Sequence, residues 1–188
     1  MFPMSPYLAT PLLVLAYGIA RIIDGFDGER GPGPAWTIGH LFFVGALVLF
    51  IRVFRDMAAM AGPRGRLFAV IGTVGAVGFI GQFAVDIVAG FLASDHAELA
   101  ALSKQVRGVP GVTLFCYDLA PYVFGVGQLG LVVLLALRKE VRVWTPVLVL
   151  ADLVMPLVDK DLIPVGAVLL FVSFLPLARK RKRVAELV

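Results

Sequence analysis

The sequence has one cysteine, Cys116, and only two histidines. A single cysteine excludes a disulfide within the chain and any CxxC redox or zinc motif. Two histidines are too few for a convincing haem site with two histidine ligands. No phosphate-binding, dinucleotide-binding, zinc-protease or serine-hydrolase motif occurs in a suitable context. The acidic stretch at 24–33 has no second acidic motif to complete a magnesium-diphosphate site. We therefore expect no metal ion and no cofactor.

Charged residues make up only 16% of the chain, whereas 60% of it is hydrophobic. Soluble domains are about 45–50% apolar, so this composition predicts an integral membrane protein. The length of 188 residues fits one domain covering 1–188. A formal net charge of +4 does not indicate nucleic-acid binding, because the basic residues gather at the ends of apolar segments. The first ten residues contain no Lys or Arg, so we expect a retained first segment and not a secretory signal.

Six apolar segments are long enough, or nearly long enough, to cross a bilayer. In lipid such segments form helices, because every backbone polar group must be satisfied internally. The predicted helices are 7–23, 35–51, 67–93, 112–137, 143–158 and 162–178. Polar stretches at 24–34, 56–66 and 94–111 separate the first four, and Asp159–Asp161 predicts a tight turn between the last two. The predicted fold is an all-α bundle of six transmembrane helices.

The distribution of Lys and Arg predicts the orientation, because these residues are enriched in cytoplasmic loops. Twelve follow the second, fourth and sixth segments: Arg52, Arg55, Arg64, Arg66, Arg138, Lys139, Arg142, Arg179, Lys180, Arg181, Lys182 and Arg183. The opposite side holds Arg30, Lys104, Arg107 and Lys160, with Arg21 nearby. We expect both termini to be cytoplasmic in a multi-pass protein of a bacterial cell membrane.

Glycines are concentrated on the third and fourth predicted helices. They are Gly72, Gly75, Gly78, Gly81, Gly125, Gly127 and Gly130. Small residues let helix backbones approach closely in lipid. We expect these two helices to be central and packed against each other.

Asp86, Asp118 and Asp152 each lie inside an apolar segment. An ionisable side chain at membrane depth is costly and by default indicates a functional site. His40 and Tyr17 lie at a similar distance from the outer ends of their helices. At 1.5 Å per residue, all five lie about 8–11 Å below the outer surface. We predict one polar layer in the outer half of the membrane, with Asp86 and Asp118 close together.

Aromatic residues stand three or four positions from these polar groups and therefore share their helix faces. The predicted aromatic walls are Trp36 and Phe43 beside His40, Phe79 and Phe83 beside Asp86, and Phe115 and Tyr122 beside Asp118. Gln82 joins the face of Asp86. Arg21 is expected to pair with Asp86 or Asp118, with Asp24 as the simpler alternative.

Structural explanations remain open for the polar residues. His40 could make only an interhelical hydrogen bond. Asp152 could bind a backbone group freed by Pro156. The two remaining carboxyl groups could simply hold helices together, although placing two of them near each other is costly.

An aspartic acid in a dry pocket can hold its proton at neutral pH and act as a Brønsted acid. Aromatic faces stabilise cations without acting as nucleophiles. An acid, aromatic walls and access from lipid are together what proton-initiated cyclisation of an isoprenoid requires. The acid would protonate an alkene or epoxide, and a second carboxylate, a histidine or water would take the final proton.

The segments "WTIGH", "GQFAVD" and "YDLAPY" lie on three successive predicted helices. In this layout the chain resembles small polytopic membrane proteins of actinobacteria. Some of these are similar to the small integral-membrane terpene cyclases of meroterpenoid and indole-sesquiterpenoid pathways. The resemblance implies Asp86 and Asp118 as proton donors and a lipophilic isoprenoid as substrate.

Two other functions fit the same residues. A carrier could relay protons through Asp86 and Asp118 to move a small amphipathic molecule. A sensor or assembly subunit would need the carboxyl groups only as contacts between helices. A pocket confined to one half of the membrane favours the enzyme, and a path through both halves favours the carrier. The sequence does not indicate an oligomeric state.

Overall fold

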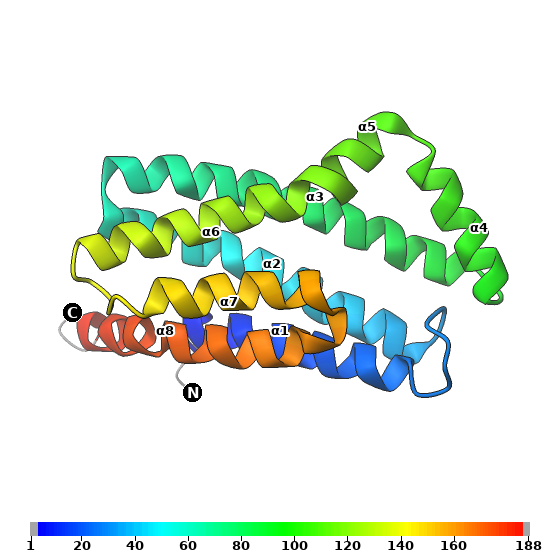
Figure 1. Cartoon of the computed structure of the whole chain (residues 1–188), viewed down its shortest axis with the longest axis horizontal. Helices are drawn as coiled ribbons and strands as arrows, with labels where there is room; N and C mark the ends of the chain where they lie inside the picture. The colour runs from blue at the N-terminus through cyan, green and yellow to red at the C-terminus, as the bar shows by residue number, and fades with distance from the viewer. Residues whose placement is uncertain (1–3, 186–188) are drawn as a thin grey trace.

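The computed structural model describes residues 4–185, with side chains described to residue 180. The described chain is entirely helical (Figure 1). Its α-helices are α1 (Pro6–Asp24), α2 (Pro34–Ala61), α3 (Pro63–Leu92), α4 (His96–Arg107), α5 (Pro110–Val112), α6 (Ala120–Leu137), α7 (Thr145–Val158) and α8 (Ile163–Ala185). A π-helical segment, η1 (Thr113–Leu119), joins α5 to α6, and one 3₁₀ turn, η2 (Lys160–Leu162), joins α7 to α8.

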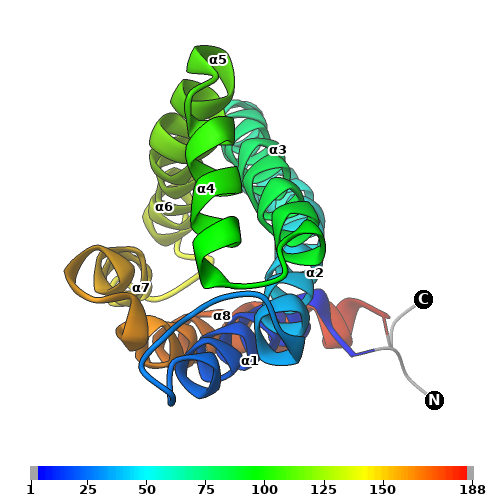
Figure 2. The same ribbon diagram turned by 90° about the vertical axis from the view of Figure 1, so that its right-hand side faces the viewer.

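The six main helices form a closed ring in which each contacts the next. The order is α1, α2, α3, α6, α7 and α8, and α8 returns to α1. Viewed end-on, α3 and α6 stand on one side and α1, α7 and α8 on the other, with α2 between them (Figure 2). α4 lies outside this ring at one end of the bundle (Figures 1 and 2).

Five helical segments are long and apolar enough to cross a membrane. They correspond to α1, α2, α3, the continuous run from α5 to α6, and the run from η2 into α8. The sixth predicted helix is α7, an apolar helix of 14 residues. α1 begins and α8 ends at the same end of the bundle (Figure 1). These features establish a helical protein with multiple membrane-length segments.

Proline begins most of these helices. It occupies the first or second position of α1, α2, α3, α5, α6 and α7. The first turn tolerates proline because its N–H would have no partner within the helix. Gly62 alone separates α2 from α3, with φ +73°. This left-handed conformation suits glycine, so the chain reverses at a single residue.

Two stretches predicted to be irregular are helical. α2 continues past residue 51 to Ala61, and α3 begins at Pro63, so the expected loop at 56–66 shrinks to Gly62. The expected loop at 94–111 contains α4. Asp95 caps α4 by accepting a hydrogen bond from the Glu98 N–H at 2.8 Å. A hydropathy window detects only apolar helices, so it did not detect that these polar stretches are helical.

The expected close packing of the two glycine-rich helices is confirmed. A Cβ atom added at Gly127 of α6 would lie 2.2 Å from the Cα of Gly72 in α3. A Cβ atom at Gly75 would lie 2.2 Å from the backbone nitrogen of Phe124. The two backbones therefore meet at distances that only glycine permits.

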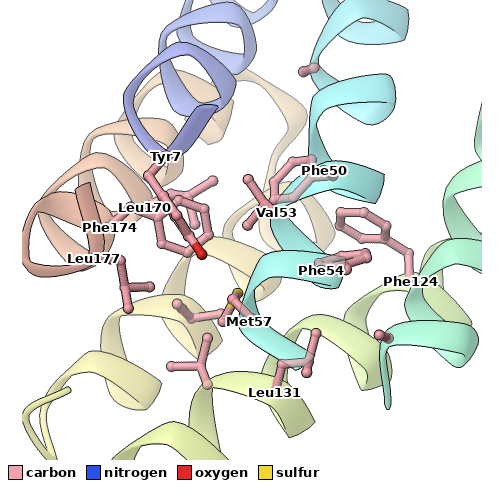
Figure 3. Close-up of a cluster of buried hydrophobic side chains, with 14 of the residues drawn as sticks. Tyr7, Phe50, Val53, Phe54, Met57, Phe124, Leu131, Leu170, Phe174 and Leu177 are labelled. Atoms are coloured by element: carbon pink, nitrogen blue, oxygen red, sulfur yellow. The ribbon is translucent and has the colours of Figure 1, made fainter. Parts of the chain in front are cut away.

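Large apolar side chains fill the part of the bundle toward the ends of α2 and α6. Figure 3 shows this core, with Phe54 and Phe124 facing each other and Tyr7 directed toward Phe174. Leu47, Val53, Phe54, Met57, Leu131, Leu135 and Phe174 are fully buried. This interior is mostly apolar, with Thr10, Gln128, Thr145 and Ser173 as fully buried polar side chains among the described residues.

Candidate functional site

Asp86 of α3 is the carboxyl group around which the site is built. It is half-buried, and the hydroxyl of Tyr117 donates a hydrogen bond to its Oδ1 at 2.8 Å. Tyr117 belongs to η1, a π-helical segment of seven residues. Such segments are rare and are frequent at functional sites. The bond joins the third and fourth membrane-length segments of the chain.

Asp118 does not approach Asp86 in the structure. Its side chain is exposed, as is that of Tyr122, which is 62% exposed. The ring of Phe115 is partly exposed but lies against α3, where a Cβ added at Gly78 would be 3.2 Å from its Cε1. The helix face that packs on α3 contains the fully buried Ala120. The exposed Asp118 and the buried Ala120 therefore lie on different sides of this segment. The structure does not bring Asp118 to Asp86, and Tyr122 forms no wall beside it, while the role of Phe115 stays a prediction.

The remaining predicted aromatic residues converge from three helices. Phe43 of α2 stacks on Phe83 of α3 with ring centroids 4.5 Å apart, and Phe79 lies 5.8 Å from Phe43. Tyr17 of α1 lies 4.8 Å from Phe43 and 5.5 Å from Phe83. We call Tyr17, Phe43, Phe79 and Phe83 the aromatic cluster. Its rings contact one another directly, so they form a packed cluster and not the walls of an open pocket.

His40 lies at the edge of the aromatic cluster and is buried. Its ring is 5.0 Å from that of Phe83 and 4.0 Å from that of Trp36. Nδ1 lies 2.7 Å from the carbonyl oxygen of Trp36. A carbonyl only accepts, so Nδ1 carries a proton, and Nε2 is the nitrogen that can accept one when the ring is neutral. His40 and Asp86 are also close enough to interact electrostatically.

A small cavity opens beside His40 toward the end of the bundle that holds the α1–α2 loop. Its volume is about 10 Å³, and its polar lining consists of Tyr17, Arg21, Asp24, Trp36 and His40. That volume is sufficient for about one water molecule. The aromatic cluster and this cavity together place polar atoms from α1 and α2 near Asp86.

Arg21 pairs with neither Asp86 nor Asp118. Its Nε lies 3.4 Å from Oδ1 of Asp161, a residue of η2. Arg30 binds both carboxylate oxygens of Asp161 at 2.8 Å. The end of the bundle that holds the α1–α2 loop therefore has an Arg–Asp–Arg cluster that connects α1, this loop and η2. Helical spacing relates only residues three or four positions apart, so it could not predict that Asp161 pairs with Arg21 and Arg30.

Asp152 occupies a different place. Its side chain packs against Gly166 of α8, where an added Cβ would lie 2.8 Å from Oδ1. Its polar neighbour is Gln128 of α6, a side chain that is 0% exposed. Asp152 therefore belongs to a buried contact among α6, α7 and α8, and the predicted single layer of carboxyl groups divides into separate sites.

Two polar residues near the carboxyl groups were not identified from the sequence. Tyr117 stands three residues before Ala120 and seven before Phe124, so it shares the face of α6 that packs on α3. That spacing was the available signal. Gln128 is the other. Gln82 had been assigned to the face of Asp86, and its Oε1 is buried without a hydrogen-bond partner among the described residues.

A larger recess lies on the outer side of α1 and α2. Its volume is about 390 Å³, and it is lined by Ala16, Ile19, Ala20, Ile23, Ala35, Ile38 and Phe42. The lining is entirely apolar, and Ala35 also lines the small cavity beside His40. Sites for small molecules commonly have volumes of about 300–1,000 Å³. The recess could hold a hydrocarbon chain with one end next to the polar cavity.

No family model, curated protein or solved structure matches this chain. Within residues 4–185 there is also no cluster of three or more His, Cys, Asp or Glu side chains that could hold a metal ion. The groups at the site that can take part in chemistry are Asp86, Tyr117, His40 and the aromatic cluster.

Proposed function

We propose that this protein is a membrane-embedded terpene cyclase in which Asp86 protonates an alkene or epoxide of a prenylated substrate. The observation that carries the proposal is the position of Asp86. It is a carboxyl group on a membrane-length helix, it accepts a hydrogen bond from Tyr117, and it lies one turn from Phe83 of the aromatic cluster. Intramembrane carboxyl groups are uncommon outside functional sites.

The reaction follows from these groups. Protonated Asp86 transfers its proton to a carbon of the alkene, or to the epoxide oxygen, and becomes a carboxylate. The hydrogen bond from Tyr117 stabilises that carboxylate and so assists the transfer. The faces of Phe43 and Phe83 stabilise the carbocation while a new ring bond forms. His40 Nε2 then accepts the proton lost from the neighbouring carbon, which creates the product alkene.

The substrate enters from lipid. The recess on α1 and α2 accommodates its hydrocarbon chain, and the shared residue Ala35 brings one end to the cavity beside His40. The cavity holds about one water molecule, so the rings of Tyr17 and Phe83 must separate when the substrate binds. The substrate is neutral in this proposal, because Arg21 and Arg30 are already paired with Asp161.

The packed inner half supports an enzyme over a carrier. The polar cavity lies toward the outer end, and fully buried apolar side chains such as Phe54 and Leu131 fill the other half. A proton-coupled carrier needs access to its site from both sides of the membrane. The described residues provide polar access near one end.

The proposal includes the finer topology. The single domain spans a bacterial cell membrane six times, α7 is the fifth crossing, and both termini are cytoplasmic. Arg64 and Arg138, at the α2–α3 and α6–α7 connections, then face the cytoplasm, and the Arg21–Asp161–Arg30 cluster lies at the outer surface.

Asp86→Asn and Asp118→Asn are a matched pair that tests the proposal. Purified protein in lipid nanodiscs is supplied with farnesylated and epoxidised farnesylated aromatic acceptors, and cyclised products are measured by mass spectrometry. Asp86→Asn should reduce turnover by about 10²–10⁴-fold, as expected for loss of a general acid. Asp118→Asn should retain turnover, because Asp118 is exposed and separate from the site. Equal turnover by the two variants would refute the proposal. The absence of cyclised product from the wild type and from both variants would also refute it.

A further inference from the structure

A chain of contacts leads from the outer end of the bundle to Asp86. Arg107, the exposed last residue of α4, holds its guanidinium carbon 5.1 Å from the centre of the Tyr117 ring. The hydroxyl of Thr113 donates to the carbonyl oxygen of Arg107 at 2.7 Å and so ties α4 to η1. Tyr117 itself donates to Asp86 at 2.8 Å. Tyr117 is half-buried, between an exposed cation and an intramembrane carboxyl group.

A proton donor inside a membrane has to recover its proton after each reaction. Packed apolar side chains such as Phe54 and Leu131 occupy the opposite half of the bundle (Figure 3), whereas Tyr117 approaches Asp86 from the end that holds Arg107. Resting on the function proposed above, we propose that Tyr117 is the positioning residue that returns a proton from the outer aqueous side to Asp86.

The transfer uses one hydronium ion from the outer surface, and the proton that His40 took from the substrate leaves to the water-sized cavity that His40 lines, so each turnover takes up one proton and releases one. The Tyr117 proton passes to Oδ1 of the Asp86 carboxylate as a hydronium ion from the outer surface gives a proton to the phenol oxygen. The O–H bond of the new carboxylic acid forms, the old phenol O–H bond breaks, and tyrosine ends neutral. The positive charge of Arg107 above the ring stabilises the negative charge that builds up on the phenol oxygen as its proton leaves.

The groups that face Asp86 leave Tyr117 as the most direct donor. They are Tyr117, Tyr17, His40, Arg107 and Lys160. His40 holds its Nδ1–H against the carbonyl of Trp36, and the proton that Nε2 takes from the substrate leaves to the cavity that His40 lines, so neither proton is directed at Asp86. Tyr117 already directs its O–H at Oδ1.

A pH jump followed by time-resolved infrared spectroscopy tests this route without a substrate. The full-length protein in nanodiscs is moved from alkaline to neutral pH, and the carboxylic-acid band that is absent from Asp86→Asn reports reprotonation of Asp86. Tyr117→Phe should slow the return of that band by on the order of 10²-fold. Tyr122→Phe is the control, because Tyr122 is on the same membrane-length segment but 62% exposed.

Arg107→Gln gives a second measurement if Tyr117→Phe is poorly folded. Arg107→Gln should slow the return of the carboxylic-acid band several-fold less than Tyr117→Phe does, because it leaves the Tyr117 hydroxyl in place. An unchanged rate in Tyr117→Phe overturns the route. Loss of cyclisation in Asp86→Asn together with an unchanged band in Tyr117→Phe would overturn this inference while leaving the proposed function intact. A slower return of the band in Tyr117→Phe, with no cyclisation by the wild type, would support this inference and overturn the proposed function.

Discussion

Phe83 makes more ring contacts around the site than its neighbours on α3. It stacks on Phe43, meets Tyr17 edge-on and lies against His40. Aromatic pairs of this kind contribute about 0.5–1.5 kcal/mol beyond simple burial. The ring also presents a π face one helical turn from Asp86, so its chemistry and its packing can be separated by substitution.

Phe83→Leu should change the ratio of cyclised products more than the total rate. Leucine remains apolar but removes the π face that stabilises the carbocation, while Asp86 can still deliver its proton. The ratio is measured by gas chromatography of the products. Phe91→Leu is the control, because Phe91 lies on the same helix and is 72% exposed. An identical product spectrum in wild type and Phe83→Leu would argue against a cationic intermediate in this cluster.

At the scale of elements, the contact between α3 and α6 sets the position of Tyr117. Gly72 and Gly127 bring the two backbones together, and this contact fixes which face of α6 and η1 meets Asp86. Gly125 lies on another face, where an added Cβ would meet Leu153 at an ordinary 3.6 Å.

Gly127→Ala should lower the stability of the protein in detergent, whereas Gly125→Ala should not. An added methyl group at Gly127 would overlap the backbone of Gly72, and overpacking typically costs about 1–3 kcal/mol. Thermal unfolding of the two purified variants provides the comparison. Equal midpoints would show that α3 can move away from α6 without cost.

The main error in predicting the site from the sequence was the choice of which face of α6 packs against α3. Gly125 and Gly127 lie two positions apart, and each supports a stripe of residues at helical spacing. The stripe of Gly125 includes Asp118, and the stripe of Gly127 includes Tyr117. Only the observed backbone contact with Gly72 selects between them. The site on α2 was predictable, because Trp36, His40 and Phe43 share one unambiguous face.

α4 is a polar element whose first turn depends on the charge of Glu98. The backbone N–H and the hydroxyl of Ser94 donate to Glu98 Oε2 at 2.8 and 2.7 Å. These hydrogen bonds favour the carboxylate and hold the pKa of Glu98 below its usual value. A group with a lowered pKa in the folded state adds stability above its unfolded pKa and loses it as the pH falls through the folded pKa.

The first turn of α4 should therefore loosen when the pH falls below the ordinary pKa of glutamate, which is about 4. Carbon-13 NMR of the Glu98 carboxyl measures its titration directly, and the midpoint should lie below that of an unstructured glutamate. Ser94→Ala should raise the midpoint toward the ordinary value, whereas Ser103→Ala, within α4 itself, should leave it unchanged. A midpoint that does not respond to Ser94→Ala would contradict this account.

At the scale of the whole molecule, the charge distribution predicts one orientation in the membrane. Lys139 lies at the α6–α7 connection and Lys104 lies on α4, near opposite ends of the bundle (Figure 1). Twelve basic residues are concentrated at the end that includes Lys139. Of these, the side chains of 181–183 lie outside the described part of the structure.

Lys139→Cys and Lys104→Cys, each in a Cys116→Ser background, test this topology in intact cells. A membrane-impermeant maleimide should label position 104 from outside, and position 139 only after the cells are opened. The positive-inside rule is the physical basis for this expectation. Labelling of position 139 in intact cells would reverse the orientation and move the site to the cytoplasmic half.

The overall arrangement was accessible from the sequence, because apolar length and basic ends depend only on composition along the chain. All six predicted segments are helical, and their order is unchanged. The cluster formed by Arg21, Arg30 and Asp161 was not accessible, since it joins residues about 130–140 positions apart that meet only after α8 packs on α1. Local spacing contains no information about such contacts.

The short α7 has a consequence for the surrounding bilayer. Its 14 residues span about 21 Å at 1.5 Å per residue. The hydrocarbon layer is about 30 Å thick, so if α7 is the fifth crossing, as proposed above, lipids along it must compress or water must enter beside Trp144 and Asp159. Hydrophobic mismatch of this kind is smaller in lipids with shorter acyl chains. The protein should therefore partition toward thinner regions of the membrane, and bilayer thickness becomes a variable that sets where it resides.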